Sequence, residues 1–217
     1  MNLLSDYGYS QKTINERVAS CWHTLFEGKK SERIYFEVDD DMGYITDTGN
    51  NDVRTEGMSY GMMMAVQMNK KDVFDRIWKW ARTYMYINEG DNKGYFCWSN
   101  ALDGKKNSNG PAPDGEEYFV MSLFFAAHRW GNGKGIFNYE KEANAILHYA
   151  IHGKNPMWNK SNYLIRFICG CPFSDPSYHL PHFYDLFSMW ADEKDADVWS
   201  KAAGASRAYL VTSCNKK

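Results

Sequence analysis

Long apolar runs and a net charge of one sign are both missing from this sequence of 217 residues. No uninterrupted apolar stretch reaches the roughly 18 residues that a membrane-spanning helix needs. A formal net charge of −2 supplies no basic field for nucleic acid. We therefore expect a protein that neither crosses a membrane nor binds nucleic acid, and whose partner is small or neutral.

Signs of export and of disulfide bonding are also missing. Residues 1–17 lack the basic segment followed by an apolar segment that marks a secretion signal, which favours the cytoplasm. Five cysteines are an odd number, and only Cys169 and Cys171 lie close together, so we expect five reduced thiols. The sequence also contains no Gly-rich phosphate loop, Ser nucleophile elbow or Cys-X-X-Cys pair.

Aromatic residues, in contrast, are abundant. They make up 16% of the chain, with 8 Trp and 15 Tyr. Large rings bury apolar area efficiently, so some of them fill the core. A chain rich in Trp, Tyr, Asp, Asn and Glu but low in net charge also suits sugar recognition, because rings cover C–H faces and polar groups bind hydroxyls. Composition alone favours neither interpretation.

The periodicity of apolar residues predicts a mostly helical, all-α chain. The expected helices span residues 10–27, 56–69, 71–88, 115–131, 138–152, 177–191 and 194–212. From the second onward, a nearly all-apolar helix alternates with an amphipathic one. An all-apolar helix lies in a core and an amphipathic one covers it, so each pair reads as an inner and an outer helix.

Three carboxylates follow this repeat. Glu56, Asp114 and Asp175 lie 58 and 61 residues apart, and each precedes or begins an inner helix. Each is also preceded by an aromatic, extended-looking stretch and a loop; these stretches are IYFEV, GYFCWS and LIRFI. Inner helices ringed by outer helices form an α/α toroid, and the loops before the inner helices gather at one end of it. We therefore expect the three carboxylates to converge on one cleft, lined by the loop 89–113.

Paired carboxyl groups are what glycoside hydrolysis needs, one to donate a proton and one to activate water or attack the sugar. Glu56 lies in an apolar, aromatic helix start and is the candidate proton donor. Asp114 and Asp175 lie beside prolines at helix entries, so capping and chemistry are equally good interpretations of them. Glutamate caps helices poorly, which weakens the capping interpretation for Glu56.

The histidines predict no metal site. His148 and His152 lie four apart on one expected helix, but no acidic third ligand at metal-site spacing accompanies them. His179 and His182 lie near Asp175, where lining the cleft, capping and packing are all open. We expect neither a metal nor a cofactor.

Several segments resemble glycoside hydrolase family 8, and within it the reducing-end xylose-releasing exo-oligoxylanases. The resemblance covers about residues 5–213 and is carried by DVRTEGMSYGMMMAVQ, GYFCWS, NGPAPDGEEYF, HRWG, PMWN and FSDPSYHLPHFY. It implies an (α/α)6 barrel that hydrolyses β-1,4-linked xylo-oligosaccharides with inversion and releases xylose from the reducing end.

The resemblance also implies roles for individual residues. Glu56 would be the general acid, and Asp114 would bind and distort the sugar at the cleavage subsite. Tyr178 would help to hold the attacking water, and Trp98 would stack on a sugar. Asp175 would be a cleft residue next to that tyrosine.

The sequence departs from the family pattern at the general base. In the enzymes that it resembles, the base is an aspartate in a later Asp-Ser-Tyr-Arg segment, which these residues do not contain. Asp175 is a weak substitute. By the repeat, a fourth inner helix would begin beyond Lys217, so we expect one partial domain over 1–217: a leading helix and three helix pairs, about half of the toroid.

Half a toroid would leave apolar faces of its inner helices uncovered, so self-association is expected. Without a positioned base, water activation would lose on the order of 10²- to 10⁴-fold in rate. The leading hypothesis is a truncated xylo-oligosaccharide hydrolase whose own activity is doubtful. The alternatives are a non-catalytic xylo-oligosaccharide-binding fragment and an unstable truncated product.

Overall fold

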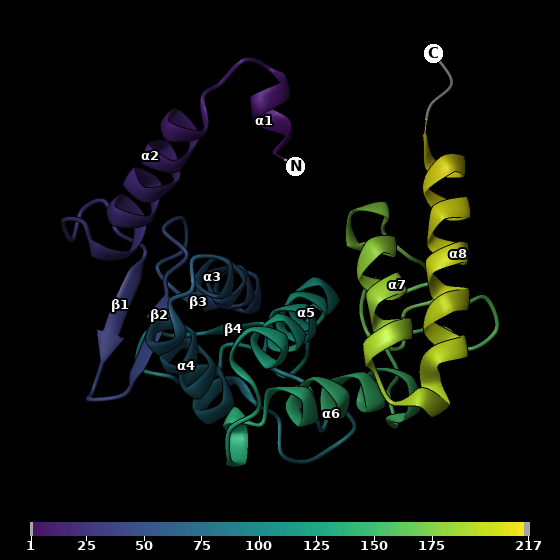
Figure 1. The fold of residues 1–217 in the computed structure, drawn as a ribbon. Coiled ribbons are helices and arrows are strands. Elements are labelled where there is room, and N and C mark those ends of the chain that lie inside the picture. The colour runs from purple at the N-terminus through teal and green to yellow at the C-terminus, as the bar shows by residue number, and fades with distance from the viewer. Residues whose placement is uncertain (1, 215–217) are drawn as a thin grey trace.

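A computed structural model describes residues 2–214 of the chain, and most of them are helical (Figure 1). The α-helices are α1 (Leu3–Asp6), α2 (Gln11–Trp22), α3 (Thr55–Gln67), α4 (Lys71–Trp80), α5 (Pro113–Trp130), α6 (Tyr139–His152), α7 (Pro181–Trp190) and α8 (Ala196–Ser213). One π-helical turn each extends α2 and α4, namely His23–Glu27 and Ala81–Met85. Short 3-10 turns are Gly135–Phe137, Pro176–Tyr178 and Glu193–Asp195. All seven expected helices are present.

The expected helix 177–191 begins later than its apolar pattern suggested. A separate 3-10 turn, Pro176–Tyr178, comes first, and α7 starts only at Pro181. Proline has no backbone N–H and its ring fixes φ, which suits the first position of a helix but not its interior. Pro181 therefore sets the start of α7.

The expectation of an all-α chain is incomplete, because the structure also contains two small antiparallel sheets. Strands β1 (Tyr35–Val38) and β2 (Met42–Ile45) form a hairpin, with Tyr35 opposite Ile45. Strands β3 (Val53–Arg54) and β4 (Ser99–Asn100) pair across a long separation in sequence. The aromatic stretch IYFEV is therefore a true strand, and β3 and β4 tie the start of α3 to the loop 89–113.

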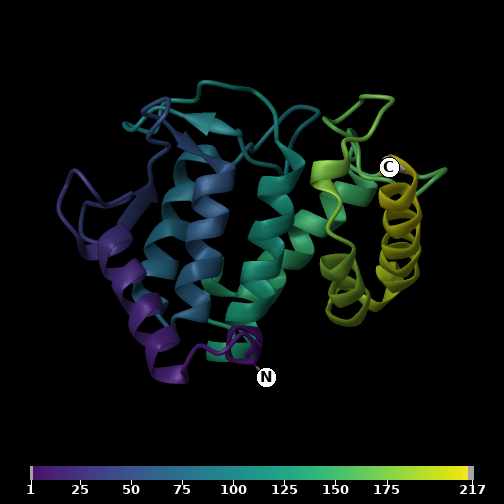
Figure 2. The same cartoon turned by 90° about the horizontal axis from the view of Figure 1, so that it is seen from above.

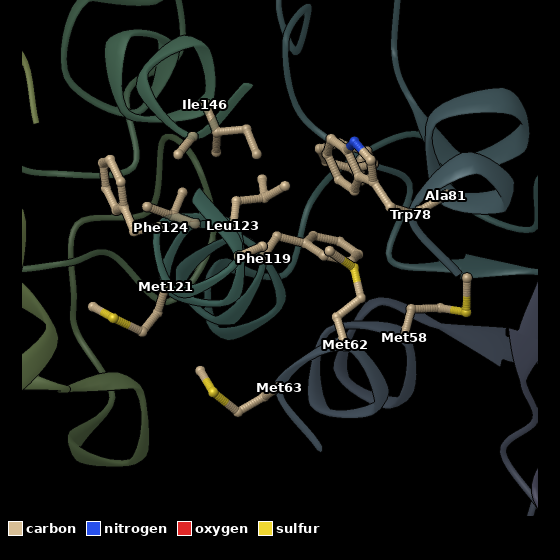
Figure 3. Packing of buried hydrophobic residues seen from close by; sticks show 14 of the residues in the cluster. Met58, Met62, Met63, Trp78, Ala81, Phe119, Met121, Leu123, Phe124 and Ile146 are labelled. Atoms are coloured by element: carbon tan, nitrogen blue, oxygen red, sulfur yellow. The ribbon is translucent and has the colours of Figure 1, made fainter. Parts of the chain in front are cut away.

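The helices follow one another along an arc, with α4, α6 and α8 outside α3, α5 and α7 (Figure 1). Helices α3 and α5 are buried on most sides, as their apolar sequences predict. Helix α4 is amphipathic and buries Phe74, Ile77, Trp78 and Trp80. Figure 3 shows Met58 and Met62 of α3 packed near Trp78 of α4 and Phe119 of α5. The burial of α3 and α5 and the amphipathic character of α4 agree with the expected alternation of inner and outer helices.

The short strands and the loops before α3 and α5 gather at one end of the molecule, opposite α1 (Figure 2). The segment before α7 reaches the same end, because Phe167 and Tyr178 share a cleft with Glu56. Within residues 2–214 no helix is both long and apolar enough to cross a membrane. The five cysteines are free thiols in the structure.

Candidate functional site

Glu56 is the second residue of α3, and backbone pairing with the loop 89–113 fixes its position. Strand β3 ends at Arg54 and pairs with β4, and the Thr55 N–H donates a 3.0 Å hydrogen bond to the Trp98 carbonyl. This bond occupies one of the N–H groups that a helix start leaves without a partner inside the helix. The Glu56 carboxyl and the Trp98 ring are therefore held on neighbouring backbone segments.

Asp114 reaches the same place because α3 and α5 approach closely at their first turns. A Cβ atom on Gly115 would lie 2.4 Å from both Cβ and Oγ1 of Thr55, closer than real side chains come. Only glycine permits this contact. The close approach brings the Asp114 carboxyl within electrostatic range of Glu56.

The environment of Asp114 favours its protonated form. Burial, followed by the charge of Glu56, raises the pKa of Asp114 to about 7. Its Oδ1 is buried and has no hydrogen-bond partner, and no side chain caps α5. Asp114 therefore does not cap α5 with its side chain, although it is an acid in the first turn of that helix.

A cleft of about 520 Å³ opens beside Glu56. The loop 89–113 forms one wall, as predicted, and residues 167–169 with Tyr178 form the other. The lining residues are Glu56, Asn92, Trp98, Ser108, Asn109, Gly110, Pro111, Ala112, Asn155, Phe167, Ile168, Cys169 and Tyr178. Amide groups and aromatic faces together make a surface that suits a sugar better than an ion.

Two aromatic side chains predicted to bind substrate lie in this cleft. The Trp98 ring is 37% exposed, and the Arg54 guanidinium lies 5.3 Å from its centroid. The Tyr178 ring stacks on Phe167, with centroids 5.6 Å apart and planes 7° from parallel. Each ring is thus supported from one side by a neighbouring side chain.

The three predicted carboxylates converge on Tyr178. Burial raises the pKa of Tyr178 to about 12, with further contributions from the charges of Asp114, Glu56 and Asp175, in that order. A phenol in this setting keeps its proton at neutral pH and can donate a hydrogen bond. The three carboxylates thus act on one phenol, but of the three only Glu56 is among the described residues that line the cleft.

Asp175 differs from the other two carboxylates in what its side chain does. It accepts hydrogen bonds of 2.8 Å from the Ser177 N–H and 2.7 Å from the Ser177 hydroxyl, and so caps the turn Pro176–Tyr178. These two bonds lower the pKa of Asp175. It is not among the residues that line the cleft. The structure therefore agrees with the capping interpretation of Asp175.

The histidines differ in their settings, and His179 belongs to the packed interior of the fold. His179 is buried and makes hydrogen bonds with the hydroxyls of Ser174 and Ser206. His152 makes a 2.8 Å contact with Asp195, whereas His182 is exposed. No group of three His, Cys, Asp or Glu in the part of the chain that the structure describes could hold a metal ion.

The sequence interpretation missed Tyr60, which lies beside the carboxylates. Burial raises the pKa of Tyr60 to about 12, followed by the charges of Asp114, Tyr118 and Glu56. Its ring is 40% exposed and packs edge-on against Tyr118, with centroids 4.5 Å apart. Residues four apart share one face of a helix, so the spacing from Glu56 could have indicated Tyr60.

Glu116 and Glu117 were also missed, although they follow Asp114 and Gly115 in the PDGEEYF segment. Both side chains are buried, and burial raises the pKa of each well above its usual value. Glu116 Oε1 accepts a 2.9 Å hydrogen bond from the Phe96 N–H, and Glu117 Oε1 is bonded to the Tyr184 hydroxyl. Three acids within four residues, beside an apolar segment, are the sequence signal for such a cluster.

Comparison with known proteins adds to this geometry. The family model of the glycosyl hydrolases family 8 matches residues 18–215. The chain is 57% identical over 220 residues to a reducing end xylose-releasing exo-oligoxylanase of Halalkalibacterium halodurans, covering 99% of this chain and 57% of that protein. It is 50% identical over 221 residues to the corresponding protein of Bifidobacterium adolescentis, of which it covers 58%.

Solved structures show the same likeness. A crystal structure of a reducing end xylose-releasing exo-oligoxylanase matches with a TM-score of 0.97 and 57% identity, over 99% of this chain and 58% of that one. The structure of Rex8A from Paenibacillus barcinonensis complexed with xylose matches with a TM-score of 0.97 and 54% identity, over the same shares. The chain thus spans somewhat more than half the length of the proteins that it resembles.

Proposed function

Because this chain belongs to the glycosyl hydrolases of family 8, we propose that it carries the proton donor and part of the substrate cleft of an enzyme that hydrolyses β-1,4-linked xylo-oligosaccharides. The observation that carries the proposal is the cleft in which Glu56, Trp98 and Tyr178 meet. The names of relatives that are 50 to 57% identical support xylose release from the reducing end.

Each residue has a role that its setting suits. Glu56 protonates the glycosidic oxygen, and Trp98 stacks on the C–H face of a xylose unit. Asp114, beside Glu56 and favouring its protonated form, donates a hydrogen bond to a sugar hydroxyl and helps to distort the ring. Tyr178 holds the attacking water, so that the reaction proceeds with inversion.

We also propose that residues 1–217 form one partial domain, equivalent to about half of an (α/α)6 toroid. The arc of three inner and outer helix pairs in Figure 1 supports this, as does the share of the relatives' length that the chain covers. Location in the cytoplasm and self-association through uncovered apolar faces stay predictions.

The general base is the part of the mechanism that we place outside this chain. Among the cleft-lining residues that the structure describes, Glu56 is the one carboxylate. Asp175, the weak substitute, is held by two hydrogen bonds to Ser177. Inversion needs two carboxyls roughly 6.5–9.5 Å apart with a water between them. Asp175 would have to leave its cap to become that second carboxyl.

A small anionic nucleophile tests the assignment of Glu56, because azide needs no base to attack the anomeric carbon. The 217-residue chain is incubated with xylotriose, with and without sodium azide, and the products are separated by chromatography. We expect little xylose in water alone, and xylose together with α-xylobiosyl azide when azide is present. Glu56→Gln should lower the azide-dependent rate by about 10²- to 10⁴-fold.

The outcomes separate the candidate functions. Equal rates for Glu56→Gln and the unmodified chain would overturn the assignment of the proton donor. Calorimetric binding of xylotriose without any product, with or without azide, would identify a binding fragment instead. A thermal melt that is not cooperative would identify an unstable product.

A further inference from the structure

Glu116 and Glu117 are the strongest feature that the proposed mechanism leaves unused. They are consecutive residues in the first turn of α5, and each is only 2% exposed. Burying a carboxyl costs free energy unless it makes compensating bonds, so such residues need an explanation. Neither lines the cleft. Their contacts run instead to the two segments that carry Trp98 and Tyr178.

Glu116 holds the segment that carries Trp98. On one side of this segment, the Cys97 N–H donates to the Met85 carbonyl and the Ile87 N–H donates to the Tyr95 carbonyl. The Phe96 N–H instead donates to Glu116 Oε1, at 2.9 Å. The glutamate thus replaces a missing strand partner two residues before Trp98. Without it, a buried N–H would lose its hydrogen bond.

Glu117 holds the segment that carries Tyr178, through the buried phenol of Tyr184. The Tyr184 hydroxyl is bonded to Glu117, accepts a hydrogen bond from the Leu180 N–H at 3.3 Å, and lies 3.2 Å from the Tyr178 carbonyl oxygen. A protonated Glu117 donates to the Tyr184 oxygen, which frees the phenol proton for the Tyr178 carbonyl. Glu117 Oε1, the Tyr184 hydroxyl and the Tyr178 carbonyl then have partners, whereas Glu117 Oε2 is buried without one.

We propose that Glu116 and Glu117 form a tandem clamp, in which adjacent glutamates of one helix turn position the two sugar-contacting aromatic residues, Trp98 and Tyr178, on opposite walls of the cleft. This inference rests on the proposed function. Both glutamates are positioning residues that act through other groups. Asp114, the proposed sugar-binding group, lies two residues before Glu116, so a single turn of α5 carries it and the supports of both walls.

The test separates the hydrogen bonds of the clamp from simple filling of space. Glu116→Gln keeps an acceptor for the Phe96 N–H, and Glu117→Gln keeps a donor for the Tyr184 hydroxyl. The corresponding Met variants keep the side-chain volume but make no such hydrogen bond. Tyr184→Phe removes the hydroxyl alone. Glu142→Met is the matched control, because Glu142 is a half-buried carboxylate on α6 that pairs with Arg82 and not with the cleft.

Two readouts are measured on the full chain: the Kd for xylotriose by calorimetry, and amide hydrogen exchange by NMR. We expect Glu116→Met to raise the Kd about tenfold, the value of one misplaced stacking contact, and to deprotect the Phe96 amide. Glu117→Met and Tyr184→Phe should deprotect the Leu180 amide and raise the Kd about threefold to tenfold. The Gln variants should bind like the unmodified chain, and Glu142→Met should lower only the Tm.

A double-mutant cycle distinguishes positioning from general destabilisation. In a Trp98→Ala background, Glu116→Met should have no further effect on the Kd, because the residue through which it acts is gone. Fully additive effects would overturn the proposal. So would Gln variants as weak as the Met variants, or a Glu142→Met variant that loses binding to the same degree.

Failure of the clamp and failure of the proposed function give different results. If the unmodified chain does not bind xylotriose, the proposed function fails, and hydrogen exchange still tests the clamp. If a Met variant does not fold, amide hydrogen exchange of the unmodified chain tests the clamp instead. The Phe96 and Leu180 amides must then be protected from exchange, and exchange at the rate of open loops would overturn the clamp.

Discussion

The start of α5 and the turn before α7 look alike in sequence and differ in chemistry. Each follows an aromatic stretch, places an aspartate beside a proline, and leads into an apolar helix. At the first, Asp114 has a buried Oδ1 without a partner and a pKa raised to about 7. At the second, Asp175 accepts two hydrogen bonds from Ser177, and its pKa is lowered.

The difference shows what separates a reactive carboxyl from a capping one. Asp175 finds its partners two residues away, so its own segment is enough to satisfy it. Backbone N–H groups of its own turn lower the pKa of Asp114 less than burial raises it, and its surroundings come from α3, which reaches it because Gly115 carries no side chain. The free hydrogen-bonding capacity of Asp114 is available to a ligand. Changes at these two sites should therefore have unlike effects.

The largest expected effect is that of Asp114→Asn on how the free energy of unfolding depends on pH. A carboxyl whose pKa is raised by folding favours the folded state at low pH, and this advantage is lost as pH rises from about 4 toward 7. Asp114→Asn should therefore gain up to about 4 kcal/mol relative to the unmodified chain at pH 8. At pH 4 the two should be nearly equal, as urea unfolding at both pH values would show.

Asp175→Asn is the matched control for that prediction. Its carboxyl has a lowered pKa, so the stability that it contributes is present at neutral pH and is lost only in acid. A gain in stability at pH 8 for Asp175→Asn, or the same pH slope for Asp114→Asn and the unmodified chain, would contradict the comparison.

The next effect concerns binding. Asp114→Ala should weaken binding of xylotriose by about 10- to 100-fold, because a sugar hydroxyl loses a buried partner worth on the order of 1.5–3 kcal/mol. Asp175→Ala should change the Kd by less than about twofold, because the Asp175 carboxyl is already bonded to Ser177. Isothermal calorimetry on both variants measures this. Equal losses would show that Asp175 also contacts the ligand.

A smaller effect is expected where α3 and α5 touch. Gly115→Ala places a Cβ 2.4 Å from Thr55, and relief of this clash should cost about 1–3 kcal/mol of stability. The shift should also separate Glu56 from Asp114 and lower the raised pKa of Asp114, which NMR titration can follow. Gly204→Ala is the control, since a Cβ there meets nothing within 4 Å. An unchanged melting temperature for Gly115→Ala would show that the helices adjust freely.

The smallest effect should come from the cap itself. Asp175→Ala removes both bonds to Ser177 and should cost about 1 kcal/mol of stability. Asp175→Asn keeps an acceptor oxygen and should cost less than about 0.5 kcal/mol at neutral pH. Thermal melts of the two variants test this order. If Asp175→Ala lost more stability than Gly115→Ala, Asp175 would have more than a capping role.

Much of the fold could be predicted because the signals are local. The 3.6-residue periodicity located all seven helices, and the alternation of apolar and amphipathic helices separated inner from outer ones. Pro181 shows the limit, because apolar character continued ahead of it while the missing N–H delayed the helix. The pair β3 and β4 was not found, since its partners are far apart in sequence and only two residues long.

The candidate site divides in the same way. Spacing indicated Glu56, Asp114 and Asp175 as a convergent set, and the family resemblance indicated Trp98 and Tyr178. Tyr60, Glu116 and Glu117 were not found. Their roles depend on residues from other helices and loops: Tyr118 for the first, Phe96 for the second and Tyr184 for the third. The sequence around such a residue gives little indication of its role, because its partners lie in other segments.

The sequence by itself determined the helices, their inner and outer faces and the family, because periodicity and motifs are properties of one stretch of chain. Only the tertiary structure decided which of two similar aspartates is buried and which is a cap. It also decided which glutamates contact the segments that carry Trp98 and Tyr178. The physical reason is that burial, and with it the pKa and the hydrogen-bonding capacity of a carboxyl, is set by what other segments bring next to it.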